Sequence, residues 1–411
     1  MLIGIVGKPN VGKSTFFKAI TLADVEIANY PFATIKPNSG VAYVKITDVA
    51  KEISGKNANP REGYVISSKN KLNSEVDHYR FVPIQVIDVA GLVPGASEGK
   101  GMGNQFLDDL RQADALIHVI DASGSTNEKG ESVGPGTYDP CNDVRFLELE
   151  LDLWYLGILE KGWAKFSRQM QQEKQDPSVA IAKQLSGLRV TEQIAKEVIG
   201  ELDLDIERPL SWTEDNLKAI AVGLRQKTKP MLIVCNKVDM PSSKKNISLL
   251  RETFPLLPLV LVSGESELAL REAGKACLIE YIPGEKSFNI LDASKLTEKQ
   301  IAALKFIEKE VVKPLEFGTG VQKALDTVVF DVLKYIAIHP GGSSKLEDKD
   351  GNVLPDCFLM PQGTTALEFA YKLHTDLGRG FIRAIDVKTK KTVGKEHVLS
   401  NLDVVEIVSS R

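Results

Sequence analysis

A glycine-rich segment near the amino terminus has residue types that could bind phosphate. Residues 7–14 read GKPNVGKS and fit the pattern G-x-x-x-x-G-K-[ST]. In such a loop, backbone N–H groups and the positive end of the following helix surround the phosphates. We expect the Lys13 ammonium to reach the β and γ phosphates and the Ser14 hydroxyl to ligate Mg²⁺. The candidate nucleotide-binding residues here are Gly7, Lys8, Pro9, Asn10, Val11, Gly12, Lys13, Ser14 and Thr15.

A carboxylate and a glycine follow a second apolar segment, VPIQVID. Asp88 and Gly91 form a D-x-x-G pattern at its end. Open α/β sheets bind ligands at the carboxyl ends of their strands, so Asp88 is a candidate to hold Mg²⁺ through water. The N–H of Gly91 is a candidate contact of the γ phosphate and would report its presence.

Two further patterns could recognise a base. Asn236, Lys237 and Asp239 form N-K-x-D after the apolar run MLIVCN. An aspartate offers two acceptor oxygens to the N1 and N2 donors of guanine, whereas adenine has no such pair of donors. The stem of Lys237 can cover the ring. Ser263 and Gly264 end the next apolar run, where a backbone N–H could meet guanine O6. These residues predict selection of GTP.

The elements that would position these residues are short apolar runs rich in branched side chains. We predict strands at residues 2–6, 82–88, 115–121, 231–236 and 259–263. Helical or loop segments separate them, which favours a parallel sheet covered on both faces. Phe16, Phe17 and Ile20 recur at helical spacing after GKPNVGKS, so that segment lies between a strand and a helix. His118 and Cys235, inside predicted strands, are expected to be a satisfied core histidine and a core thiol.

The rest of the chain divides by texture. Residues 142–227 predict a helical insertion, because apolar residues step by three and four. Its acidic excess is slight, which favours a solvated helical hairpin over a dedicated binding arm. Residues 297–312 predict a helix capped by Thr297 and ended before Pro314. From about residue 326, short alternating strands, glycine turns and a helical stretch at 364–377 predict a small α+β module.

Composition bounds the class of protein. The chain has 411 residues, which favours two or three domains, and a formal net charge of −4. It therefore has no global basic field; a nucleic-acid partner must meet a local patch or a larger complex, and no DNA partner is expected. The 4 cysteines lie far apart, which argues against disulfides and zinc and fits a reducing cytosol. No run approaches the length of a membrane span, so we expect a cytoplasmic protein without a membrane partner.

Together, the strand-end patterns resemble those of translation-factor-class GTPases of the Obg superfamily, most closely the YchF group in its archaeal form. Residues 29–34 (NYPFAT) resemble the first switch of that superfamily, and residues 95–104 (GASEGKGMGN) resemble its glycine-rich second switch. The resemblance implies that Thr34 ligates Mg²⁺ in the triphosphate state. Residues 354–377 and 403–408 resemble the TGS module, a ubiquitin-like β-grasp. The resemblance covers nearly the whole chain.

The resemblance also implies a domain organisation. It places an α/β, Obg-type P-loop G domain with a mainly parallel sheet at residues 1–141 and 228–283, with a helical, coiled-coil-like insertion at 142–227. A helical connector would occupy 284–325 and a TGS domain 326–411. Some YchF-group members replace the aspartate of N-K-x-D and prefer ATP, but this chain retains Asp239 and should prefer GTP. Contact with ribosomes or RNA is implied by the family alone.

The predicted mechanism has a gap at Leu92. Small GTPases have a glutamine there that orients the attacking water, and an alkyl side chain cannot do so. Hydrolysis must then use another group or a bound ion, or be slow. Asn10 resembles the potassium-coordinating asparagine of some related GTPases, and K⁺ there could stabilise developing charge. The alternative is that Asn10 only braces the loop.

The expected function is that of a GTP-hydrolysing switch that uses GTP, GDP and Mg²⁺. Lys13, Thr34 and Gly91 are the residues expected to be closest to catalysis. Loss of the γ phosphate would release the contacts of Thr34 and Gly91 and so change the surface offered to a partner. The alternatives are a P-loop ATPase or kinase, and a nucleotide-dependent RNA- or ribosome-binding adaptor with little catalysis.

Overall fold

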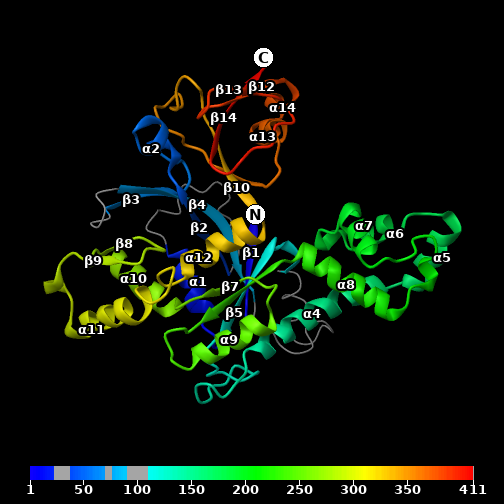
Figure 1. The fold of residues 1–411 in the computed structure, drawn as a ribbon, viewed down its shortest axis with the longest axis horizontal. Coiled ribbons are helices and arrows are strands. Elements are labelled where there is room, and N and C mark those ends of the chain that lie inside the picture. Colours follow the sequence, from blue (N-terminus) through cyan, green and yellow to red (C-terminus); the bar gives the residue numbers. More distant parts are fainter. Residues whose placement is uncertain (23–37, 70–75, 90–109, 411) are drawn as a thin grey trace.

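A mixed β-sheet forms the centre of the molecule (Figure 1). The computed structural model describes residues 1–22, 38–69, 76–89 and 110–410. Within them the strand order is β2-β4-β1-β5-β6-β7, with β3 also paired to β4. Strands β4, β1, β5, β6 and β7 are parallel, whereas β2 and β3 run antiparallel to β4. The strands are β1 (Leu2–Val6), β2 (Ser39–Thr47), β3 (Tyr64–Lys69), β4 (Val76–Asp88), β5 (Ala115–Asp121), β6 (Met231–Asn236) and β7 (Leu259–Leu261).

The predicted parallel sheet, covered on both faces, is confirmed. β5 and β6 are buried along their whole length, which explains their unbroken apolar sequences. Alternate side chains face opposite cores. Ile5 and Ile117 face the core that α1 (Lys13–Thr21) and α12 (Val321–Asp326) cover. Val6 and Ile120 face the core shared with α4 (Cys141–Glu160) and α9 (Ser243–Thr253).

The segment of the chain that joins β5 to β6 forms a helical region that extends from the sheet (Figure 1). Its two long helices, α4 and α8 (Glu214–Thr228), pack along each other and are joined by the Arg225–Asp152 ion pair (2.8 Å). The shorter helices α5 (Trp163–Glu173), α6 (Pro177–Gln184) and α7 (Glu192–Glu201) lie beyond them. Trp163 and Trp212 stack there with ring centroids 5.5 Å apart and are mostly buried. The region is therefore a packed bundle, larger than the hairpin expected, and its core is continuous with the core on one face of the central sheet.

Helical segments connect the sheet to the carboxyl-terminal module. After α10 (Gly264–Lys275), the strands β8 (Ile279–Tyr281) and β9 (Phe288–Ile290) pair, and α11 (Glu298–Phe306) continues as a π-helix over Ile307–Val312. Thr297 and Gln300 form the capping box of α11, so the helix predicted at 297–312 is confirmed. α12 continues as a second π-helix, Thr327–Val332, which packs on the central sheet. This helix runs without a break across residue 326, where we placed a domain boundary.

The carboxyl-terminal module has a sheet of order β11-β10-β14-β12-β13 with two helices on it. β10 and β14 are parallel, and the other pairs are antiparallel. The predicted helix at 364–377 is split at His374, whose backbone is extended (φ −162°, ψ 143°) and whose ring accepts a hydrogen bond from the Asp376 N–H. The elements are β10 (Tyr335–Pro340), β11 (Phe358–Pro361), α13 (Ala366–Leu373), α14 (Thr375–Arg379), β12 (Phe381–Asp386), β13 (Lys391–Val393) and β14 (Asp403–Ser409).

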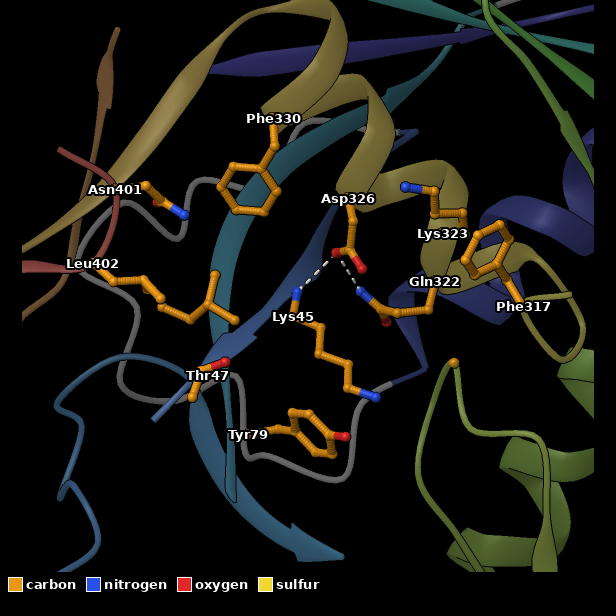
Figure 2. A pocket seen from close by; sticks show the side chains of 12 residues that line it. Lys45, Thr47, Tyr79, Phe317, Gln322, Lys323, Asp326, Phe330, Asn401 and Leu402 are labelled. Carbon is orange, nitrogen blue, oxygen red and sulfur yellow. Dashed lines mark hydrogen bonds between the residues drawn. The ribbon is translucent and has the colours of Figure 1, made fainter. Parts of the chain in front are cut away.

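Two sets of contacts hold this module and α12 against the central sheet. The guanidinium of Arg80, on β4, is buried and donates to the carbonyl oxygens of Leu354 (2.6 Å) and Pro355 (2.8 Å). On the outer strand β2, the Lys45 N–H donates to the Asp326 carboxylate (2.8 Å). Figure 2 shows this bond and the one that Gln322 donates to Asp326. In the part of the chain that the structure describes, each helix is too short or too polar to span a lipid bilayer.

Candidate nucleotide-binding site

The phosphate loop lies where the sequence predicts it, between the end of β1 and the start of α1. Gly12 is in the left-handed region (φ 91°), and a Cβ there would lie 2.2 Å from Asn236 Nδ2. A Cβ on Gly7 would lie 2.5 Å from the carbonyl oxygen of Val119. Both glycines of the motif are therefore required by close packing, and the loop is pressed against β5 and the N-K-x-D segment.

A cavity of about 400 Å³ brings most of the predicted residues together. Gly7, Val11, Ser263 and Gly264 are buried in its supporting layer and do not line it. Met240 and Glu265 also line it and were not among the predicted site residues, although Met240 directly follows N-K-x-D and Glu265 directly follows Ser263 and Gly264. The other lining residues are Lys8, Pro9, Asn10, Gly12, Lys13, Ser14, Thr15, Asn236, Lys237 and Asp239.

Asn236 joins the phosphate end of the cavity to its base end. Its Nδ2 donates to the Val11 carbonyl oxygen (2.9 Å), and its Oδ1 accepts from the Gly264 N–H (3.0 Å). Asp239 Oδ1 accepts from the Ser263 hydroxyl (2.9 Å). The carboxylate predicted to read the base is thus held by the loop at 263–264, and that loop is held by Asn236.

Lys237 is positioned by an aspartate that the sequence analysis missed. Lys237 Nζ lies 3.0 Å from Asp121 Oδ2, at the carboxyl end of β5. Asp121 is almost fully buried and also accepts from the hydroxyls of Ser123, Ser125 and Thr126. Burial raises the pKa of Asp121, but the hydrogen bonds from Ser123 and Lys237 outweigh it and the net pKa is lowered. The signal was available, because Asp121 ends an apolar strand just as Asp88 does.

Lys13 and Asp88 form an ion pair at the phosphate end. Lys13 begins α1 and Asp88 ends β4, so adjacent parallel strands bring the two charges together. Ser14 lies beside Lys13 in the first turn of α1 and lines the cavity. A hydroxyl and a carboxylate are oxygen donors of the kind that Mg²⁺ prefers, and they fit a site completed by phosphate oxygens and water. Among the described residues, no group of three or more His, Cys, Asp or Glu could hold a metal alone.

The Lys8 side chain points away from the expected phosphate position. Its ammonium contacts Asp143 (2.8 Å), in the first turn of α4, the Thr126 carbonyl oxygen (3.0 Å) and the Tyr138 ring (3.8 Å from its centroid). Burial lowers the pKa of Lys8 and raises that of Asp143. The Lys8 side chain therefore ties the phosphate loop to the helical region.

For Asn10 the structure shows a bracing contact, one of the two alternatives predicted, whereas for His118 only part of the prediction is confirmed. Asn10 Nδ2 donates to the Gly130 carbonyl oxygen (2.8 Å), a bracing contact with the segment after β5. His118 is buried in the core as predicted, but its Nδ1 has no hydrogen-bond partner among the described residues, so the part of the prediction that called the ring satisfied is wrong. Burial lowers the pKa of His118 to about 3, and the ring is neutral. His118 also lines a second cavity, of about 410 Å³, together with Lys8 and Pro9 of the phosphate loop.

Part of the predicted site lies outside the described residues. Thr34, Gly91 and Leu92 belong to it, as do the segments 29–34 and 95–104 that resemble the two switches. Their roles remain predictions from the sequence.

Comparison with known families covers most of the chain. Residues 2–135 match the family described as 50S ribosome-binding GTPase. Residues 234–341 match the G4 motif-containing domain of YGR210-like Obg-like GTPases, and residues 348–409 match the TGS domain. These matches agree with the P-loop, N-K-x-D and carboxyl-terminal patterns described above.

Similar proteins span the full length. An uncharacterized GTP-binding protein of Methanocaldococcus jannaschii is 47% identical, over 100% of this chain and 99% of its own. The Bacillus subtilis protein named ribosome-binding ATPase YchF is 30% identical, over 98% of this chain and 97% of its own. The crystal structure of a GTP-binding protein from Pyrococcus horikoshii superposes with a TM-score of 0.75, at 38% identity and full coverage of both chains. The chain belongs to the Obg-like, YchF-type family of P-loop GTPases that carry a TGS domain.

Proposed function

We propose that this protein binds GTP with Mg²⁺, hydrolyses it to GDP and phosphate, and acts as a nucleotide-dependent switch. One observation carries the proposal: Asp239 and the phosphate loop line the same cavity, with the carboxylate oriented by Ser263. The base and the triphosphate of one nucleotide would then be read at opposite ends of one site. A carboxylate there complements the N1 and N2 donors of guanine.

Calorimetric titration of the full-length protein with GTP, GDP and ATP, each with Mg²⁺, tests the proposal. We expect GTP and GDP to bind and ATP to bind more weakly. Phosphate release over many turnovers then tests hydrolysis. Binding of guanine nucleotides without turnover would favour the adaptor alternative, and absence of binding would refute the proposal.

The geometry suggests how the phosphate end would work. Lys13 is paired with Asp88, so an arriving phosphate would draw the ammonium away and leave the carboxylate free to bind the hydration shell of a metal. Mg²⁺, when bound, supplies positive charge that stabilises the leaving phosphate oxygens. Ser14 and Asp88 would hold it, together with Thr34. Thr34 and Gly91 would sense the γ phosphate, and their release would be the switching event.

A monovalent cation is a further proposed cofactor, because Leu92 cannot orient water by hydrogen bonding. K⁺ bound near Asn10 would stabilise charge that an arginine stabilises elsewhere. Asn10 uses its Nδ2 to bind Gly130, which leaves its carbonyl oxygen as the group to face a cation. Turnover measured in K⁺ and in Na⁺ tests this idea, and equal rates would remove it.

We also propose a ribosomal or RNA partner and a cytoplasmic location. The support is the printed name of the B. subtilis relative and the description of the family that matches residues 2–135. We propose that the helical insertion (142–227) and the TGS domain (326–411) carry the message to that partner, with the G domain at 1–141 and 228–283 and a connector at 284–325. Co-sedimentation with ribosomal subunits, in GDP and in a non-hydrolysable GTP analogue, tests the partner.

ATP hydrolysis is the second candidate. It is favoured by the name of the same B. subtilis relative, which is called an ATPase. Asp239 speaks against ATP here, because a carboxylate finds no matching pair of donors on adenine. Competition between the two nucleotides for the site separates these candidates.

A further inference from the structure

At the base end of the cavity, the loop at residues 263–264 positions Asp239. This loop is in turn fixed by residues that belong to none of the nucleotide-binding motifs. Ser263 is buried, its hydroxyl donates to Asp239, and its backbone N–H donates to the Thr319 carbonyl oxygen (3.0 Å). A hydroxyl has a single proton, so the contact with Ser266 Oγ (2.8 Å) is one in which Ser263 accepts. The orientation of the Asp239 carboxylate therefore depends on where Thr319 places residue 263.

Thr319 precedes α12 and lies far from every nucleotide motif in the sequence. Its side chain is fully buried, and its hydroxyl donates to Glu267 Oε2. The next residue, Gly320, has φ 79°, and a Cβ there would lie 1.8 Å from the Leu261 carbonyl oxygen. The backbone at 319–320 is thus pressed against the end of β7, two residues before Ser263.

Glu267 is the centre of the cluster that fixes Thr319. It is fully buried on α10 and accepts hydrogen bonds from Arg271 Nε (2.6 Å), Tyr281 OH (2.6 Å) and Thr319. A buried carboxylate is costly unless such donors satisfy it. Burial and the neighbouring Glu267 raise the pKa of Tyr281 well above its usual range, so its hydroxyl remains a donor. None of these four residues lines the nucleotide cavity.

We propose that the cluster of Tyr281 and the buried residues Glu267, Arg271 and Thr319 sets purine selectivity, by fixing the Ser263–Gly264 loop that orients Asp239. These are positioning residues, since none touches the cavity. The inference rests on the proposed binding of GTP and names residues that control it. The phosphate loop packs on Val119 at Gly7 and meets the 263–264 loop through Asn236, so disturbance of the cluster should weaken guanine recognition more than it weakens the grip on phosphates.

Thr319→Val and Thr319→Ser make a matched pair for the test, because valine keeps the shape and loses the hydroxyl while serine keeps the hydroxyl. Dissociation constants for GTP and ATP with Mg²⁺ are measured on full-length proteins. We expect Thr319→Val to weaken GTP binding by about tenfold and ATP binding by less than about twofold, the scale of one or two lost hydrogen bonds. Thr319→Ser should stay close to the wild type.

Tyr281→Phe removes another donor to Glu267, and it tests the cluster independently if Thr319→Val does not fold. We expect the same selective loss of GTP affinity. An unchanged GTP to ATP ratio in the folded variants, or an equal loss for both nucleotides, would overturn the inference, as would a loss in Thr319→Ser equal to that in Thr319→Val. If the wild-type protein itself does not prefer GTP, the proposed function and this inference both fail. If it does and the variants keep that preference, only this inference fails.

Discussion

The residues of the candidate nucleotide-binding site offer oxygen atoms and ammonium groups to a ligand. For most of these residues, the position in the fold could be predicted from the sequence motifs. A strand followed by GKPNVGKS and a helix leaves Lys13 and Ser14 no other place than the carboxyl end of the sheet. The direction of the Lys8 side chain could not be predicted, because its partner Asp143 lies 135 residues away and belongs to another element. Thr319 escaped notice for the same reason, since no local pattern marks a residue that acts on a loop 56 positions earlier.

Asp239 offers a test at the scale of one carboxylate. Asp239→Asn replaces an acceptor oxygen by an amide donor, which would face the N1 and N2 donors of guanine. We expect guanine selectivity, measured as the ratio of GTP to ATP affinity, to fall by about 1 to 3 kcal/mol. Asp203→Asn, at an exposed turn of the helical region, is the matched control and should change nothing. Unchanged discrimination in Asp239→Asn would refute the assignment of Asp239.

Lys8 and Asp143 allow a test of buried charge. Asp143→Asn would leave the buried Lys8 ammonium without its counter-charge, and we expect a loss of about 3 kcal/mol in the free energy of unfolding. The exposed pair Lys18–Glu272 provides the comparison, since Glu272→Gln should cost less than about 1 kcal/mol. Urea titration of both variants gives the two values. Equal small losses would mean that the Lys8 pair contributes no more than a surface pair.

At the scale of elements, the periodicity of apolar residues predicted those strands and helices whose sequence pattern is uniform from end to end. β5 and β6 are continuous apolar runs, and α11 has a capping box at its start. Periodicity did not predict the π-helical turns at Ile307–Val312 and Thr327–Val332, since the extra residue in each turn is accommodated by packing. It also reduced the helical region to a hairpin, because the stacking of Trp163 on Trp212 joins distant segments.

The contribution of the contact between β2 and α12 to the stability of the protein should depend on pH. Burial raises the pKa of Asp326 from its usual value of 3.8 to about 7. The folded protein then holds a proton on Asp326 that the unfolded chain releases near pH 4, so the contribution of this group to stability is full at low pH and is lost as the pH rises through about 7. Asp326→Asn does not titrate and keeps an acceptor oxygen for Lys45 and Gln322.

We therefore expect Asp326→Asn to gain stability relative to the wild type by about 1 to 3 kcal/mol between about pH 5 and about pH 8. Denaturant titration of both proteins at the two pH values measures the difference. A difference that does not change with pH would show that the carboxyl group is already ionised in the folded protein.

For the whole molecule, the kinds of domain could be predicted from the sequence, but their contacts could not. The TGS pattern predicted the carboxyl-terminal module, and the family match agrees with it. Nothing in residues 346–357 indicates that they receive the side chains of Arg80 and Arg61, because these contacts join segments nearly 300 positions apart. Likewise, α12 continues without a break across residue 326 into the π-helix at Thr327–Val332. This continuous helix packs in the central core and also leads into the last module.

Arg80 tests how firmly the module is held. Arg80→Met removes a buried guanidinium that donates to the carbonyl oxygens of Leu354 and Pro355. Of these two oxygens, only that of Pro355 keeps another donor among the described residues, the Arg61 N–H, so we expect a loss of about 2 to 4 kcal/mol in stability. Arg61→Met removes the exposed ion pairs to Asp348 and Asp356 and should cost less than about 1 kcal/mol. Calorimetric unfolding compares the two. A similar effect of both substitutions would contradict a central role for Arg80.

The side chains of α12 also cover part of the sheet that would otherwise attract other chains. In the described sheet β2 is the last strand on its side, and Gln322 and Asp326 bind its backbone at Tyr43 and Lys45. Open strand backbones are templates for pairing between molecules. A chain that ends before residue 321 would therefore lose α12 as well as the final module. The backbone of the edge strand β2 would then be exposed, and we expect such a chain to aggregate. Packing of α12 against β2 thus keeps the protein soluble.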